Sequence, residues 1–294
     1  MVPCPRGVRF QVSGVSRQIE THFKGWVKPG VVPPGADATP EVAPGETLDA
    51  ISGHFRVFQL RDGHRFSTDD VLTAWYGTTW ASCPARVLDL GSGIGSVGMI
   101  AAWRLPGSRV VAVEAQHDSV RLARKSAAYN GLDARYEVRL ADFRTDQAFQ
   151  PDERFDLVLG SPPYFPPGSG IEGDHPQKVA CRFEMRGDIR DYARVAAMHL
   201  APGGLFACVF PEMDRRRVED AAGSERLTIV RRRPVVFREG EPPLVGLFAM
   251  MRRDDLPAHM RERTWIEPPL IIRRADGSVH QEYAAIKLAV GFPP

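Results

Sequence analysis

Residues 155–165 have the sequence FDLVLGSPPYF, in which an apolar run ends in a serine, two prolines and two aromatic residues. The apolar run predicts a strand buried in a parallel sheet. Pro162 and Pro163 each fix φ and lack an N–H, so neither a strand nor a helix can continue through them. Ser161 precedes a proline and is restricted to extended conformations. The sequence therefore predicts a stiff loop at the carboxyl end of a strand, where open α/β sheets bind their ligands.

This loop offers hydrogen-bond acceptors beside an aromatic ring. Ser161 Oγ and the carbonyls of Ser161 and Pro162 have no strand ladder to join, so they are free to bind a planar polar group. Tyr164 provides a ring on which a flat substrate can stack. The same residues could also form an ordinary surface turn, so the interpretation depends on the rest of the chain.

Composition limits the classes of protein to consider. The chain has 294 residues, 43% of them hydrophobic, and a formal net charge of +2. These values suit a soluble α/β protein, and the near-neutral charge permits a nucleic-acid partner without requiring one. No apolar run approaches the roughly 18 residues of a membrane span, and the N-terminus lacks the apolar region of a signal peptide. We therefore expect a cytoplasmic protein that does not enter a membrane.

Four cysteines are scattered along the chain, at Cys4, Cys83, Cys181 and Cys208. They form no C-x-x-C motif and lie near no pair of histidines. This spacing argues against a zinc site and against a disulfide framework, and it favours a reducing compartment. We expect no metal.

A second predicted strand, residues 86–90, runs directly into Gly91-Ser92-Gly93-Ile94-Gly95 and then a helix. Glycines at a strand-to-helix turn let the backbone approach a ligand closely. The next strand ends in Glu114, about twenty residues later, where a carboxylate can accept hydrogen bonds from both hydroxyls of a ribose. The strand after that ends at Asp142-Phe143, which offers an acceptor for an exocyclic amino group and a ring to pack on a purine.

Strands and helices alternate strictly from residue 86 to residue 210. This order predicts an α/β fold with a doubly wound, mainly parallel Rossmann-like sheet of seven strands. Residues 227–233 and 244–251 are predicted as two further strands, and their close spacing predicts an antiparallel pair at one edge. Strand 270–273 and a terminal helix near residues 281–290 follow.

The glycine turn could bind either a dinucleotide, such as a nicotinamide or flavin cofactor, or S-adenosyl-L-methionine. Residues 93–98, GIGSVG, fit the G-x-G-x-x-G motif of nicotinamide and flavin enzymes, but that motif alone is a weak signal. Asp89 lies just before the first glycine, and a pyrophosphate gains nothing from a carboxylate there. S-adenosyl-L-methionine carries an amino acid, a ribose, a purine and no phosphate, so it suits Asp89, Glu114 and Asp142 better.

These features together resemble a class I methyltransferase with a [DNS]-P-P-[YF] loop, which methylates a planar amino or amide nitrogen. The flanks resemble the bacterial tRNA (adenine-N6)-methyltransferases that act beside the anticodon of a valine tRNA. The similar segments are Glu46-Thr47-Leu48-Asp49, Phe58-Gln59, Phe66-Ser67-Thr68-Asp69, Gly168-Ser169-Gly170, residues 180–184 (ACRFE), residues 270–273 (LIIR) and residues 281–283 (QEY).

Composition and the resemblance together predict a division of the chain. Residues 1–45 are expected to form an irregular extension, in which proline and glycine dominate from residue 29. Residues 46–294 form the methyltransferase domain, with an N-terminal cap at 46–80, a core at 81–253 and a C-terminal tail at 254–294.

The resemblance also implies roles by position. S-adenosyl-L-methionine is expected to bind at Gly91, Gly93 and Gly95, with Asp89 near its amino-acid part, Glu114 on the ribose, and Asp142 with Phe143 on the adenine. Thr68 and Asp69 are expected to close over its methionine end. The reaction site comprises Ser161, Pro162, Pro163 and Tyr164, and RNA, with tRNA as the expected class, contacts Tyr164, Phe165 and Arg182.

An exocyclic amino nitrogen has its lone pair delocalised into the ring. Acceptors at Ser161 Oγ and the Pro162 carbonyl would bind its two hydrogens and favour a tetrahedral, nucleophilic nitrogen. Tyr164, with Phe165, would stack the extruded base. Positioning then suffices without a strong base or a metal.

The resembled family has Asn where this chain has Ser161, and S-P-P-Y occurs in methyltransferases that act on cytosine N4 in DNA. Four alternatives to adenine N6 in tRNA therefore stay open. They are a cytosine-N4 target, amide methylation of a protein, methylation of a small molecule, and a non-catalytic module that binds S-adenosyl-L-methionine and RNA. The sequence leaves the oligomeric state undetermined.

Overall fold

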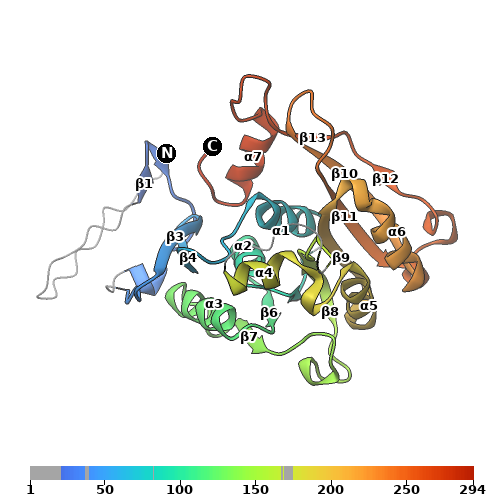
Figure 1. Ribbon diagram of the computed structural model, residues 1–294, viewed down its shortest axis with the longest axis horizontal. Helices are drawn as coiled ribbons and strands as arrows, with labels where there is room; N and C mark the ends of the chain where they lie inside the picture. The colour runs from blue at the N-terminus through green and yellow to red at the C-terminus, as the bar shows by residue number, and fades with distance from the viewer. Residues whose placement is uncertain (1–20, 37–39, 82, 167, 169–174) are drawn as a thin grey trace, which may run out of the picture.

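The computed structural model describes residues 21–36, 40–81, 83–166, 168 and 175–294 (Figure 1). The helices are α1 (Thr68–Trp80), α2 (Ser96–Arg104), α3 (His117–Tyr129), α4 (Pro176–Arg182), α5 (Ile189–His199), α6 (Arg215–Ser224) and α7 (Gln281–Ala289). The strands are β1 (His22–Phe23), β2 (Trp26–Val27), β3 (Glu46–Ser52), β4 (Phe55–Leu60), β5 (Arg86–Leu90), β6 (Arg109–Glu114), β7 (Tyr136–Leu140), β8 (Phe155–Gly160), β9 (Leu200–Pro211), β10 (Leu227–Arg238), β11 (Val245–Arg252), β12 (Trp265–Ile266) and β13 (Leu270–Arg273).

The predicted seven-stranded sheet is present, in the order β7-β6-β5-β8-β9-β11-β10. The first five of these strands are parallel, and β11 lies antiparallel between β9 and β10. Two short strands outside the count of seven, β12 and β13, pair in parallel with β10 and make the sheet nine-stranded. β13 is the strand predicted at residues 270–273, whereas β12 was not predicted. The doubly wound, mainly parallel fold is confirmed.

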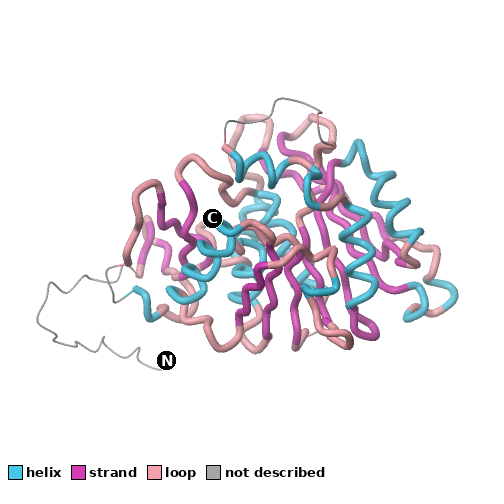
Figure 2. The backbone as a smooth tube through the Cα atoms, turned by 60° about the horizontal axis from the view of Figure 1, so that its bottom comes forward, coloured by secondary structure: helices cyan, strands magenta, loops and turns pink. Residues whose placement is uncertain are grey.

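Helices cover both faces of this sheet (Figure 2). Side chains alternate along each strand, so Leu157 and Leu159 of β8 face a core shared with α1, α2 and α3, while Val158 faces the core under α5 and α6. Because both faces are buried, the central strands read as continuous apolar runs. Because β5, β6, β7 and β8 run parallel, their carboxyl ends lie together at one rim of the sheet.

The N-terminal segments lie on the side of α2 and α3 (Figure 1). The β3–β4 hairpin packs there through backbone and side-chain bonds: Phe58 N donates to Ser126 Oγ and Arg56 N donates to Asn130 Oδ1, each at 2.9 Å. The chain end returns to this hairpin, because Gly53 N donates to the carbonyl of Gly291 at 2.7 Å. Residues 1–20, within the expected N-terminal extension, and Ser169 and Gly170 of the similar segments lie outside the described residues.

Two absences apply to the described residues. None of their helices is both long enough and apolar enough to cross a membrane. They also contain no cluster of three or more His, Cys, Asp or Glu side chains arranged to hold a metal ion.

Candidate active site

The glycine turn after β5 adopts the backbone conformations that only glycine takes easily. Gly91, Gly93 and Gly95 all have positive φ, at 59°, 54° and 84°. A Cβ on Gly91 would lie 2.0 Å from the hydroxyl of Tyr192, whereas a Cβ on Gly93 would meet nothing within 4 Å. Gly93 therefore leaves open space at the turn, and Gly91 is packed under an aromatic side chain.

Two aspartates are buried beside this turn. Asp89 is 1% exposed, and its Oδ2 accepts a hydrogen bond of 2.8 Å from Gly98 N at the start of α2. Asp70 forms a capping box with Ser67, the N-cap residue that precedes α1, and its Oδ2 accepts from Ser67 N at 2.8 Å. Desolvation by burial raises the pKa of Asp89 to about 8 and that of Asp70 to about 7. The turn is thus flanked by carboxyls whose ionised form lacks a cationic partner.

Glu114 ends β6 and holds the turn from the other side. Its Oε2 accepts from Gly93 N at 2.9 Å and its Oε1 accepts from Gln116 N at 2.7 Å. Burial raises the pKa of Glu114. Each carboxylate oxygen retains a second lone pair, so two further donors can bind.

Asp142 and Phe143 follow β7 and lie at the same rim. Asp142 makes a two-pronged ion pair with Arg144, and this hydrogen bonding lowers the pKa of Asp142. Phe143 is buried and meets Tyr192 edge to face, with ring centroids 4.7 Å apart.

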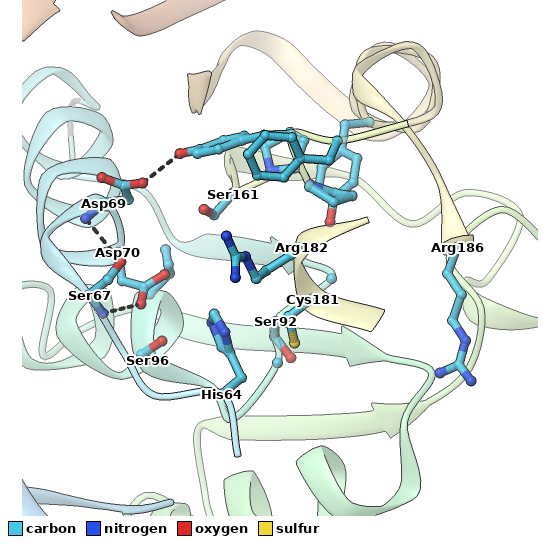
Figure 3. A pocket seen from close by; sticks show the side chains of 18 of the residues that line it. His64, Ser67, Asp69, Asp70, Ser92, Ser96, Ser161, Cys181, Arg182 and Arg186 are labelled. Carbon is cyan, nitrogen blue, oxygen red and sulfur yellow. Dashed lines mark hydrogen bonds between the residues drawn. The ribbon is translucent and has the colours of Figure 1, made fainter. Parts of the chain in front are cut away.

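The S-P-P-Y loop follows β8. Hydrogen bonds hold Tyr164 in this loop through both its backbone and its side-chain hydroxyl. The backbone N–H groups of Tyr164 and Phe165 both donate to the carbonyl of Arg182 at 3.2 Å. The Tyr164 hydroxyl donates to Oδ2 of Asp69 at 2.6 Å (Figure 3). Tyr164 is half-buried: it lines a cavity and also packs against the hydrophobic cores on both faces of the sheet. Ser161 Oγ has no hydrogen-bond partner within the described part of the chain.

One cavity of about 610 Å³ brings these segments together. Nearly all the predicted residues line it: Asp69, Asp89, Gly91, Gly93, Glu114, Asp142, Phe143, Ser161, Pro162, Pro163, Tyr164, Phe165 and Arg182. Gly95 lies in the glycine turn but outside this lining. Thr68 lines a neighbouring cavity instead, where its side chain bonds to Tyr283.

Several lining residues were not singled out from the sequence. They include His64, Ser67, Asp70, Ser92, Ser96, Cys181, Arg186 and Tyr192. The sequence does indicate a role for Asp70, because it lies three residues after Ser67, the spacing of a capping box. His64 points toward the reaction loop from the segment before α1 (Figure 3), and burial lowers its pKa. Nothing in its local sequence indicates this position.

The charge of the lining restricts the ligand. Six carboxyl side chains line the cavity (Asp69, Asp70, Asp89, Glu114, Asp142 and Asp214) against two arginines, Arg182 and Arg186. The buried hydroxyl of Ser92 has no hydrogen-bond partner among the described residues. This lining suits a cationic ligand with several polar groups and disfavours a pyrophosphate.

Comparisons with known proteins identify the family. Residues 78–174 match the model of the methyltransferase small domain family. A tRNA1(Val) (adenine(37)-N6)-methyltransferase of Porphyromonas gingivalis is 31% identical over 192 residues, which cover 61% of this chain and 73% of that protein. The protein of the same name from Tolumonas auensis is 27% identical over 234 residues, covering 79% and 92%.

Among solved structures, a predicted O-methyltransferase from Agrobacterium tumefaciens has a TM-score of 0.59 at 22% identity. The match covers 76% of this chain and 98% of that one, and it supports the fold. The family resemblance is confirmed by the sequence relatives. The chain belongs to the family of the tRNA1(Val) (adenine(37)-N6)-methyltransferases, and it is an S-adenosylmethionine-dependent methyltransferase.

Proposed function

We propose that this enzyme transfers a methyl group to an exocyclic amino nitrogen of a nucleobase in RNA, with adenine N6 of a tRNA as its target. The observation that carries the proposal is that the S-P-P-Y loop and the acid-lined glycine turn line one cavity. The printed names of the relatives, which specify adenine 37 of tRNA1(Val), support the choice of base and RNA. Such a substrate implies a cytoplasmic enzyme.

The acid-lined half of the cavity fits S-adenosyl-L-methionine. Asp89 lies beside the turn for the amino-acid end, and Asp69 contributes a second carboxylate from α1. Glu114 has lone pairs left for two ribose hydroxyls, and Asp142 with Phe143 offers an acceptor and a ring for the adenine. When bound, the cofactor supplies a methyl group already activated by a sulfonium.

The other half of the cavity orients the acceptor amine. Ser161 Oγ and the Pro162 carbonyl accept the two hydrogens of the amino group, which draws the nitrogen lone pair out of conjugation with the ring. Ser161 Oγ is available because no described residue bonds to it. Tyr164 stacks on the extruded base, and its bond to Asp69 holds the hydroxyl end of the ring in place.

Phe165 and Arg182 extend the loop toward the RNA. The Arg182 guanidinium lies 5.7 Å from the centroid of the Phe165 ring, and Phe165 is exposed. An exposed ring beside a cation can stack on a neighbouring base and attract a phosphate.

The proposal is tested with labelled S-adenosylmethionine and unmodified valine tRNA transcripts that carry adenine, cytosine or guanine at position 37. We expect label only in the adenine transcript, and N6-methyladenosine by nucleoside mass spectrometry. Parallel incubations with DNA, protein and small-molecule fractions test the other acceptors. Label in any of these, or in the cytosine transcript, would replace the proposed target.

Ser161→Ala distinguishes catalysis from a binding module. We expect turnover to fall on the order of 100-fold while cofactor affinity, measured by calorimetry, stays unchanged. Ser224→Ala, the same change on an exposed turn of α6, is the matched control. A parallel loss of turnover and cofactor affinity would make Ser161 a structural residue instead.

A further inference from the structure

A second cavity, of about 400 Å³, adjoins the first at the start of α1. Its lining comes from the carboxyl end of β10, from β13 and from α7, which lie beside one another (Figure 1). Phe237 lines both cavities. Thr68 lines the second cavity and its neighbour Asp69 lines the first, so the beginning of α1 and Phe237 lie between the two cavities.

Three cations line this second cavity: Arg238, Arg273 and Lys287. None of the three forms an ion pair with a described carboxylate. Arg273 donates one hydrogen bond, to the carbonyl of Gly277 at 2.9 Å. Burial and the nearby Arg273 lower the pKa of Lys287. The cations therefore repel one another in the absence of an anion.

The acidic residues nearby do not neutralise them. Glu241 is the single carboxylate among the described lining residues. Glu282, on the first turn of α7, forms an ion pair with Arg233. The lining is thus the reverse of the first cavity, which is dominated by carboxyls. Thr68 and Tyr283 add hydroxyls that can bind an anion's oxygens.

We propose that the second cavity binds a backbone phosphodiester of the RNA whose base enters the first cavity. The inference rests on the proposed function, because it takes a nucleobase in the first cavity as its starting point. Arginine presents paired N–H donors that match phosphate oxygens, and lysine adds a point charge. A phosphate bound beside Phe237 would hold the RNA strand next to the target base, which must unstack from its neighbours to enter the first cavity.

The test uses Arg238→Gln with Lys287→Gln, two cations whose side chains form no hydrogen bond with the described residues. We measure the affinity for the valine tRNA transcript by fluorescence anisotropy over a series of KCl concentrations, without S-adenosylmethionine. We expect the double variant to bind about 10-fold more weakly at ~0.1 M salt. The slope of log affinity against log salt should fall by about one for each lost contact. Glu241→Gln should tighten binding.

The control removes the same charge elsewhere. Arg109 and Arg154 are exposed just at or before the amino ends of β6 and β8, the opposite rim of the sheet. Arg109→Gln with Arg154→Gln should leave affinity near the wild-type value. Equal losses in the two double variants, or no loss in the first, would overturn the inference, as would a wild-type protein that binds no RNA.

The methyl-transfer assay separates this inference from the proposed function. Wild-type protein that binds RNA through the second cavity but transfers no methyl group to it would contradict the proposed function alone. Methylation of tRNA with unchanged binding by the Arg238–Lys287 variant would contradict the second cavity alone. Replacing KCl with potassium phosphate at equal ionic strength should weaken RNA binding further, since free phosphate competes for the same groups.

Discussion

Tyr164 and Asp69 are joined by a hydrogen bond of 2.6 Å, although 95 positions separate them in the sequence. The bond ties the loop after β8 to the first turn of α1. Burial raises the pKa of Asp69, and the bond from Tyr164 opposes that rise. The pair therefore couples the residue expected to stack the substrate to a carboxylate on the cofactor side.

Two substitutions of Tyr164 separate its ring from its hydroxyl. Tyr164→Phe keeps the ring but removes the bond to Asp69, so we expect a several-fold fall in kcat. Tyr164→Ala also removes the stacking surface, worth about 1–3 kcal/mol per base, so KM for RNA should rise by about 10-fold or more. Steady-state kinetics with tRNA check both. Equal effects from the two variants would show that the ring does not contact the base.

The glycine turn allows a matched pair of substitutions. Gly91→Ala places a Cβ 2.0 Å from the Tyr192 hydroxyl, whereas Gly93→Ala meets nothing within 4 Å and suffers only its positive φ, at a cost of about 1–2 kcal/mol. We expect Gly91→Ala to lower thermal stability far more than Gly93→Ala does. Gly91→Ala should also lower cofactor affinity. Adding Tyr192→Phe should restore much of the loss, because the next ring atom is 3.1 Å away. Failure of this rescue would contradict the packing explanation.

The buried aspartates predict how stability and cofactor binding depend on pH. Burial raises the pKa of Asp89 to about 8 and that of Asp70 to about 7, against about 3.9 in an unfolded chain. The folded protein binds these protons more tightly, so their stabilising effect is complete below about pH 4 and is lost as the pH rises to 8.

We therefore expect Asp89→Asn to raise the melting temperature of the ligand-free protein at pH 8 more than at pH 5. S-adenosylmethionine should bind wild-type protein more tightly as the pH rises from 6 to 8, with release of protons. Calorimetry in buffers of different ionisation enthalpy measures that release. Binding that does not change with pH would show that neither carboxyl faces the cofactor's cationic groups.

The C-terminal tail is held to the core by a buried ion pair. Glu267 accepts from Arg231 at 2.9 and 2.8 Å and from the Tyr76 hydroxyl at 2.8 Å. Glu267→Ala leaves the Arg231 guanidinium buried without a counter-charge, so we expect a loss of about 3–5 kcal/mol in urea unfolding. Glu262→Ala, which removes a surface pair with Arg253, should cost less than about 1 kcal/mol. Similar losses would contradict the role assigned to burial.

The sequence predicted the parts of the fold that depend on local chemistry. The central strands could be predicted because burial on both faces demands apolar runs. Ser67 with the two acids at positions 69 and 70 is likewise a local pattern typical of a helix start, and α1 begins there. β12 was not readable, because its two residues show no periodicity and pair only through tertiary contact with β10. β3 was missed because its buried side chains do not alternate along the strand.

In the candidate site, too, residues set by local sequence could be predicted and residues set by tertiary packing could not. Asp89, Glu114 and Asp142 could be identified because each ends or closely follows a parallel strand and so reaches the same rim. Tyr192 enters the site from the interior face of α5, where its spacing is that of any core residue. The family resemblance assigned Thr68, together with Asp69, to the cofactor side. Successive residues at a helix start point in different directions, and Thr68 lines the second cavity.

The pairing of β12 and β13 with β10 also bears on self-association. β10 is twelve residues long and would otherwise expose an unpaired backbone edge, which is a template for strand addition between molecules. The two short strands occupy that edge at residues 231–232 and 235–238. Removal of the last thirty residues would uncover it, so we expect the truncated protein to aggregate more readily than the full chain.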